Sequence, residues 1–195
     1  AGMGKVWAVS IHFMCLVFFL YIFASNNSEY VLSTYQLGGP AEAALATSMS
    51  PAGGIIAGLV IGPFVSVFKK YSAPVFCGLA AVGLALPTFV TGSLMGIYIG
   101  GFFTGFTMMG FSSYIMNALH GMVPENQYSR AMSVFSGFFN TGMLVAIYVV
   151  AFLAGLFFHS SGDVHGKFFI GTVGAVICMA ASFFIYLPNK TKGRE

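Results

Sequence analysis

Long apolar runs, separated by short polar stretches, follow one another along the whole chain. A helix needs about 20 mainly apolar residues to cross the hydrocarbon core of a bilayer. Six segments meet or approach that length: residues 6–24, 43–68, 75–90, 95–119, 131–158 and 168–187. The pattern predicts an all-α protein: an integral membrane helical bundle of six transmembrane helices that form a single domain over residues 1–195.

The composition supports a membrane protein over a soluble one. Apolar residues make up 57% of the 195 residues and charged residues only 7%, whereas a soluble domain carries about 25% charged residues. A soluble chain of this composition would expose large apolar patches and aggregate. Cys15, Cys77 and Cys178 lie within apolar runs, so we expect three reduced packing residues.

The charged residues predict the orientation of the helices. Glu29 and Glu42 lie in the first link, whereas Asp163 and Lys167 lie in the fifth. Seven of the eight basic residues fall on the opposite side: Lys5, Lys69, Lys70, Arg130, Lys190, Lys192 and Arg194. The positive-inside rule places that side, with both termini, in the cytoplasm. We therefore expect a protein integral to the plasma (inner) membrane, with a polar tail at residues 188–195.

The two halves of the chain show a weak internal symmetry. Segments 43–68 and 131–158 are both long and rich in small residues, and each follows a link with a proline. Each is the second helix of a set of three. Because three is odd, the two sets would enter the membrane from opposite sides, which is the arrangement of two inverted three-helix repeats.

Three stretches resemble the C-terminal six-helix half of a major facilitator superfamily (MFS) transporter. Residues 28–70 combine a tyrosine-bearing helix end, a Leu-Gly turn, a glycine-rich helix and a basic link. Residues 62–72 resemble the family's loop G-x-x-x-D-R-x-G-R-K: Gly62 and Lys70 match, but Ser66 and Lys69 replace the aspartate and the loop glycine. Residues 124–142 resemble the second cytoplasmic link, in which a proline and Arg130 precede a small-residue helix.

The resemblance implies a secondary active transporter, or one half of it, that moves a small organic solute by alternating access. It also implies a second six-helix half as partner, supplied by a separate chain, by another part of the same chain or by a homodimer. Gly62, Lys69, Lys70 and Arg130 become gating-loop candidates. The alternative is a non-transporting membrane subunit or sensor that uses the six-helix half for interaction.

Polar groups inside a membrane are costly, so each one is a candidate for function. His12 lies near the middle of the first segment, where it would either carry a proton or hydrogen-bond a carbonyl in the packed bundle. Helical spacing places Phe19, Phe23 and Asn26 on its face, which would line a cavity with an aromatic wall or form the bundle interior. An amphipathic solute suits such a lining.

Two further groups of polar residues have open interpretations. Asn26 and Asn27 would offer amides to a substrate or cap the end of a helix. In segment 131–158, Ser136 and Asn140 form a polar stripe with Ser133 and Gly137. That stripe would contact a substrate or make interhelical hydrogen bonds.

Other classes lack their sequence signatures. The chain has no N-P-A turns, no H-E-x-x-H and no serine protease pattern, so we expect no enzyme. It also lacks C-x-x-C spacing, and His159, Asp163 and His165 share one flexible link, so we expect no metal and no cofactor. No basic stretch would follow a phosphate backbone, which argues against nucleic acid as a partner.

Overall fold

Six α-helices, joined by short turns, make up nearly all of residues 2–187, which are the residues described by the structure, a computed structural model. The basic tail at 188–195 lies outside the described residues. The elements are α1 (Met3–Glu29), η1 (Tyr30–Thr34, a π-helix), α2 (Pro40–Phe68), η2 (Lys69–Tyr71, 3-10), α3 (Ser72–Phe89), α4 (Leu94–Leu119), η3 (Glu125–Gln127, 3-10), α5 (Tyr128–Phe158) and α6 (Val164–Tyr186).

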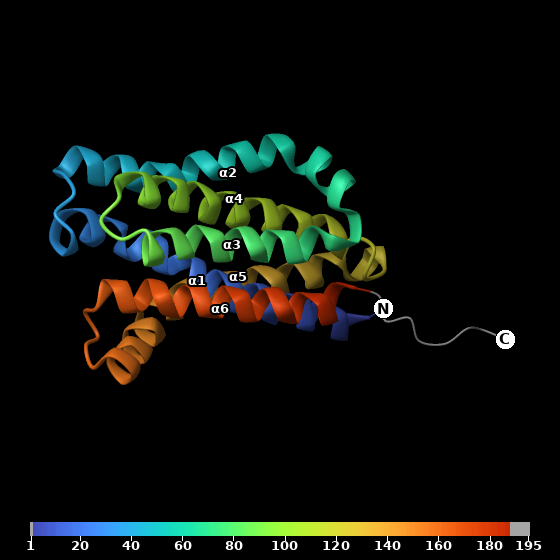
Figure 1. The fold of residues 1–195 in the computed structure, drawn as a ribbon. Helices are drawn as coiled ribbons and strands as arrows, with labels where there is room; N and C mark the ends of the chain where they lie inside the picture. Colours follow the sequence, from blue (N-terminus) through green and yellow to red (C-terminus); the bar gives the residue numbers. More distant parts are fainter. Residues whose placement is uncertain (1, 188–195) are drawn as a thin grey trace.

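The described chain contains five continuous helical stretches that are long and apolar enough to cross a membrane. The longest, Pro40–Phe89, has 50 residues and contains both α2 and α3. The chain reverses at η2, so α3 runs back alongside α2 (Figure 1). Lys69 makes this reversal with φ 48°. The protein is thus an all-helical membrane bundle, and the six predicted segments correspond to α1 to α6.

The helices form two layers. α2, α4, α1 and α5 make a row, since α2 packs on α4, α4 on α1, and α1 on α5. α3 and α6 pack on each other and against α4 and α1 respectively, and they lie in front of α1 and α5 in Figure 1. The row therefore has one face covered by α3 and α6, and an opposite face that no helix of the described residues covers.

The packing pattern has the symmetry of two inverted three-helix repeats. Exchanging α1 with α4, α2 with α5 and α3 with α6 maps the pair α1–α5 onto α4–α2 and the pair α1–α6 onto α4–α3. The pair α3–α6 maps onto itself. Because each repeat has three helices, α4 starts at the opposite end from α1, and since six is even, α6 ends at the end where α1 starts (Figure 1). We call this the η2 end and the opposite end the η1 end.

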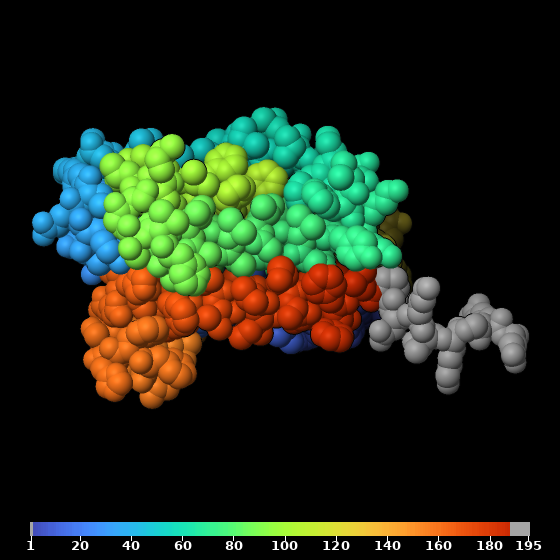
Figure 2. Space-filling model, viewed as in Figure 1, coloured from blue at the N-terminus to red at the C-terminus, as the bar shows by residue number. Residues whose placement is uncertain are grey.

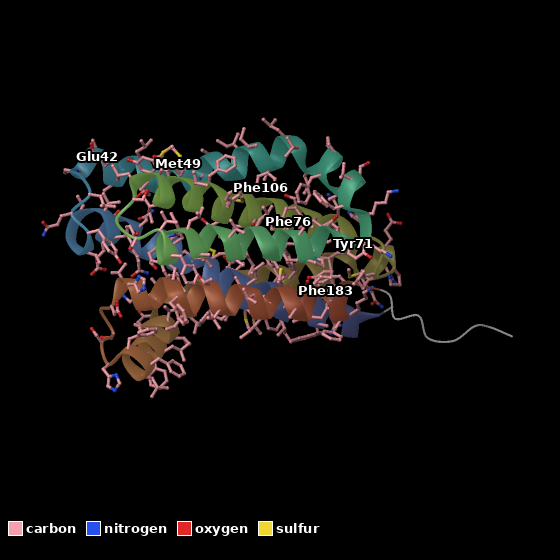
Figure 3. The ribbon with its side chains drawn as sticks, viewed as in Figure 1. Glu42, Met49, Tyr71, Phe76, Phe106 and Phe183 are labelled. Atoms are coloured by element: carbon pink, nitrogen blue, oxygen red, sulfur yellow. The ribbon has the colours of Figure 1, made fainter. Side chains whose placement is uncertain are left out.

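An aromatic core joins the layers. Phe76 of α3 stacks on Phe111 of α4 with ring centroids 5.4 Å apart, Phe111 meets Phe13 of α1 at 5.5 Å, and Phe13 stacks on Phe135 of α5 at 5.2 Å. Phe76 and Phe106 point into the space between α2, α3 and α4 (Figure 3). Aromatic pairs of this geometry add to the stability gained by burial.

α2 and α5 are the least buried helices. Five of the 29 residues of α2 and six of the 31 residues of α5 are buried, against 13 of 26 in α4. The last turns of α5 project away from the rest of the bundle at the η1 end (orange in Figure 2). Both helices therefore present most of their surface to whatever surrounds the bundle.

Candidate functional site

α1 stays helical through the polar residues Ser25–Glu29. The Ser25 hydroxyl donates to the carbonyl of Tyr21 at 3.0 Å, and the Asn26 amide donates to the carbonyl of Ile22 at 2.9 Å. These bonds satisfy the polar groups within the helix itself. The interpretation of Asn26 and Asn27 as a helix cap is therefore wrong, because α1 continues to Glu29 and passes into η1.

Two tyrosines fix the chain after α1. The Tyr30 hydroxyl donates to the carbonyl of Pro87 at 3.1 Å and accepts from the backbone N–H of Gly92 at 3.3 Å. The Tyr35 hydroxyl lies 3.3 Å from Nδ1 of His165 in α6. Partial burial, and to a lesser extent the nearby Asp163 carboxylate, raise the pKa of Tyr35. Its hydroxyl therefore stays protonated at neutral pH.

Lys167 reaches α1 from the first turn of α6. The Asp163 carboxylate accepts a hydrogen bond from the Gly166 N–H at 3.1 Å and so caps α6. Helix α6 consequently starts before Lys167, which is not in the link as the sequence suggested. The Lys167 Nζ donates to Oδ1 of the buried Asn26 at 3.1 Å.

A small cavity of about 190 Å³ surrounds this hydrogen bond. We call it the Lys167 cavity. α6 contributes Lys167, α1 contributes Ile22, Ser25, Asn26 and Glu29, and α5 contributes Ala146, Ile147, Val150 and Ala151. A basic, an acidic and an amide side chain thus meet at the η1 end of the bundle, between apolar walls.

The polar stripe of α5 lies on the surface of the bundle. Asn140 is exposed, and the bond its amide makes in the described structure goes to the carbonyl of Ser136 in its own helix, at 2.8 Å. Ser133 and Gly137 are exposed as well, and Ser136 is partly exposed. Helical spacing places Asn140 on the same face of α5 as Ile147 and Ala151, which line the Lys167 cavity. The stripe and the cavity therefore share one side of α5.

The residues predicted to share one face of α1 lie partly in the packed bundle and partly at the Lys167 cavity. His12 is buried, with Nε2 2.9 Å from the carbonyl of Cys178 and Nδ1 3.4 Å from the Tyr186 hydroxyl. The Phe19 ring lies so close to Gly174 that a Cβ there would overlap it. Phe23 packs on Phe168, with centroids 5.8 Å apart. Of the four predicted residues on this face, Asn26 is the one that lines the Lys167 cavity.

Other predicted residues lie apart from the cavity. Asn27 is buried and accepts from Thr47 of α2 at 3.4 Å. Gly62 is exposed in α2, and Lys70 lies 5.0 Å from the Tyr71 ring centroid. Lys69 and Arg130 are exposed, and no ion pair joins the gating-loop candidates within residues 2–187. Cys77 and Cys178 are buried as expected, but Cys15 is exposed.

The sequence interpretation did not connect Lys167 with Asn26 and Glu29. One signal was available, since Lys167 is the single basic residue placed among the outer links. A basic residue on the side of a membrane protein that has few other basic residues is costly to place. We therefore expect a local interaction that stabilises it in that position. The hydrogen bond with Asn26 is such an interaction. The sequence alone could not predict it, because 141 positions separate the two residues.

The geometry defines a helical membrane protein with inverted repeats and a polar cavity between α1, α5 and α6. The family model of the Major Facilitator Superfamily matches residues 14–195. Because this match covers most of the chain, the protein belongs to that superfamily of membrane transporters. No curated protein and no solved structure matches the chain.

Proposed function

We propose that this chain is a six-helix half of a secondary transporter that moves a small organic solute by alternating access. The observation that carries the proposal is the polar stripe on the exposed surface of α5. An exposed asparagine in the middle of a membrane span is costly if it faces lipid. It is favourable if the same surface borders a water-filled pathway at the centre of a larger assembly.

The exposed helices support a second six-helix unit as partner. A transporter of this kind holds its substrate between two halves that rock about it near the midplane. α2 and α5 are the helices whose surfaces the six-helix bundle leaves least covered. A partner packed against the exposed surfaces of α2 and α5 would enclose Asn140 at the centre of the assembly.

The orientation follows from the described charges. Lys5, Lys69, Lys70 and Arg130 belong to the η2 end, and Glu29, Glu42 and Asp163 belong to the η1 end. The positive-inside rule assigns the η2 end, with both termini, to the cytoplasm of a cell bounded by this plasma membrane. The Lys167 cavity then lies near the outer surface.

Uptake by reconstituted vesicles tests the proposal. Vesicles with the protein are incubated in an extract of small metabolites, and the trapped solutes are compared with those of empty vesicles by mass spectrometry. Native mass spectrometry of the same preparation determines whether a second six-helix unit is present. We expect at least one organic solute to accumulate, and Asn140→Leu to lower its initial uptake rate about tenfold, because a buried polar contact is lost.

Thr141→Val is the matched control. Thr141 is the next residue of α5, is also exposed and also bonds its own helix, at 2.8 Å to the carbonyl of Gly137. It lines a different cavity, together with Cys15 and Phe18 of α1. Its substitution should leave uptake within about twofold of the unmodified protein. Equal losses in both variants would remove Asn140 from the pathway, and no accumulation by any assembly would contradict transport itself.

A further inference from the structure

The Lys167 cavity holds a cation whose position is fixed but whose hydrogen-bonding capacity is mostly unused. An ammonium group has three donors, and its hydrogen bond to Oδ1 of Asn26 uses one of them. Within residues 2–187, Lys167 forms no ion pair with a carboxylate. Two N–H donors therefore remain for an anionic group in the cavity.

The hydrogen bonds of the Asn26 side chain orient it to accept a hydrogen bond from Lys167. Its side chain is 6% exposed, and its amide nitrogen donates to the carbonyl of Ile22 at 2.9 Å and to the Ser25 hydroxyl at 2.8 Å. Both donors are occupied, so the amide cannot rotate without losing them. Its Oδ1 consequently points at α6 and accepts from Lys167.

Glu29 supplies a negative group to the same cavity. It follows Asn26 by three positions on α1, and both residues line the cavity with Ser25. Glu29 is exposed and forms no ion pair with Lys167 within the described structure. The two opposite charges thus face a common space without neutralising each other. A ligand with one charge of each sign would pair with both.

The walls favour a small ligand with an apolar part. Ile22, Ile147 and Val150 contribute apolar surface, which lowers the local dielectric constant and strengthens the interactions of nearby charges. The volume of 190 Å³ corresponds to that of about six water molecules in the liquid. A solute of amino-acid size fits that space, whereas a drug-sized ligand needs a larger pocket.

We propose that the Lys167 cavity binds a small zwitterionic solute, with Lys167 and Asn26 at its carboxylate and Glu29 at its ammonium group. This inference rests on the proposed function, because it names the substrate class that the transporter takes up from the outer side. Charge-assisted hydrogen bonds at both ends of the solute would select a zwitterion over a molecule with one charge.

Three probes of nearly the same shape test the charge requirement. Leucine carries both groups, isoamylamine lacks the carboxylate, and 4-methylpentanoate lacks the ammonium group. Their dissociation constants are measured from the thermal stabilisation of the purified full chain in detergent. We expect leucine to bind at least about tenfold more tightly than either analogue, since each analogue leaves one charge of the site unpaired.

Variants assign each charge to its residue. Lys167→Gln should remove the advantage of leucine over isoamylamine, and Glu29→Gln should remove its advantage over 4-methylpentanoate. Lys5→Gln and Glu125→Gln remove the same charges at the η2 end and should leave all three constants unchanged. A preference that is equal in the variants and the controls, or no stabilisation by any probe, would overturn the proposal.

The uptake assay separates this proposal from the proposed function. Uptake of an organic solute that is insensitive to Lys167→Gln and Glu29→Gln would overturn the zwitterion site and leave transport standing. Leucine binding that depends on both residues, in a protein that transports nothing, would support the site and contradict transport.

Discussion

His12 shows how a polar residue in a membrane span can serve the packing of the bundle. A ring nitrogen beside a carbonyl must be the donor, so Nε2–H donates to the carbonyl of Cys178 at 2.9 Å. Nδ1 is then the acceptor and receives the Tyr186 hydroxyl at 3.4 Å. Both partners belong to α6, so the imidazole joins α1 to the second layer and leaves no nitrogen for a solute.

His12→Leu should destabilise the protein without changing its transport mechanism. Loss of an interhelical hydrogen bond in a membrane protein costs about 0.6–1.7 kcal/mol, which a lower unfolding temperature in detergent would report. Tyr186→Phe removes the longer bond alone and should cost less. The pH dependence of uptake should keep its shape in both variants, and a flattened profile in His12→Leu would show instead that the ring carries the coupled proton.

At the residue scale, the sequence predicted which groups are polar within the spans but not what they contact. Helical spacing correctly grouped His12 with Asn26 on one side of α1, since periodicity is local. It could not identify α6 as the neighbour, against which Phe19 contacts Gly174 and Phe23 packs on Phe168. The partners of His12 and Asn26 lie 166 and 141 positions away in the sequence.

At the scale of helices, small residues decide where two backbones approach. A Cβ on Gly53 of α2 would overlap the carbonyl of Phe102, and one on Gly105 of α4 would overlap the carbonyl of Ser50. Membrane helices associate through this kind of close packing, because lipid provides little hydrophobic driving force. Gly58, one turn further along α2, has no atom within 4 Å of such a Cβ.

Gly53→Ala and Gly58→Ala form a matched pair on one helix. We expect Gly53→Ala to separate α2 from α4 and to destabilise the bundle by about 1–3 kcal/mol through overpacking. Gly58→Ala should change stability by no more than about 0.5 kcal/mol. The unfolding temperature and the monodisperse fraction after size-exclusion chromatography measure both effects. Ala raises the helix propensity equally at both positions and so cannot itself cause a loss of stability. A similar loss in the two variants would therefore contradict the α2–α4 contact as the cause.

The predicted segments identified the helices, but each helix begins before the apolar run from which it was predicted. α1 starts at Met3 rather than residue 6, and α6 starts at Val164 rather than residue 168. Hydropathy falls at polar residues, whereas a helix continues wherever its backbone bonds continue. α1 therefore includes Ser25–Glu29, in which polar side chains bond within the helix or to α2 and α6. Asn26 and Glu29, which line the Lys167 cavity, belong to the turn that hydropathy omitted.

For the whole molecule, the alternation of helices and the charges at their ends give one consistent topology. The chain runs along α2 from Glu42 at the η1 end to the η2 turn, which contains Tyr71 (Figure 3). The inverted relation of the two repeats followed from the odd number of helices in each, and the packing of α1–α5 and α2–α4 has that symmetry. The sequence had no means of showing which face of the four-helix row stays uncovered, because that depends on where α3 and α6 pack.

Labelling of single cysteines tests the orientation directly. Cys15, Cys77 and Cys178 are first replaced by alanine, and Glu42→Cys or Lys70→Cys is then introduced at opposite ends of the bundle. A membrane-impermeant maleimide should label Glu42→Cys in intact cells and Lys70→Cys only after the membrane is opened. Glu42 is partly exposed and Lys70 is exposed, so a difference in labelling between the two positions reports the side of the membrane. Labelling of Lys70→Cys in intact cells would invert the topology, and the Lys167 cavity would then admit its solute from the cytoplasm.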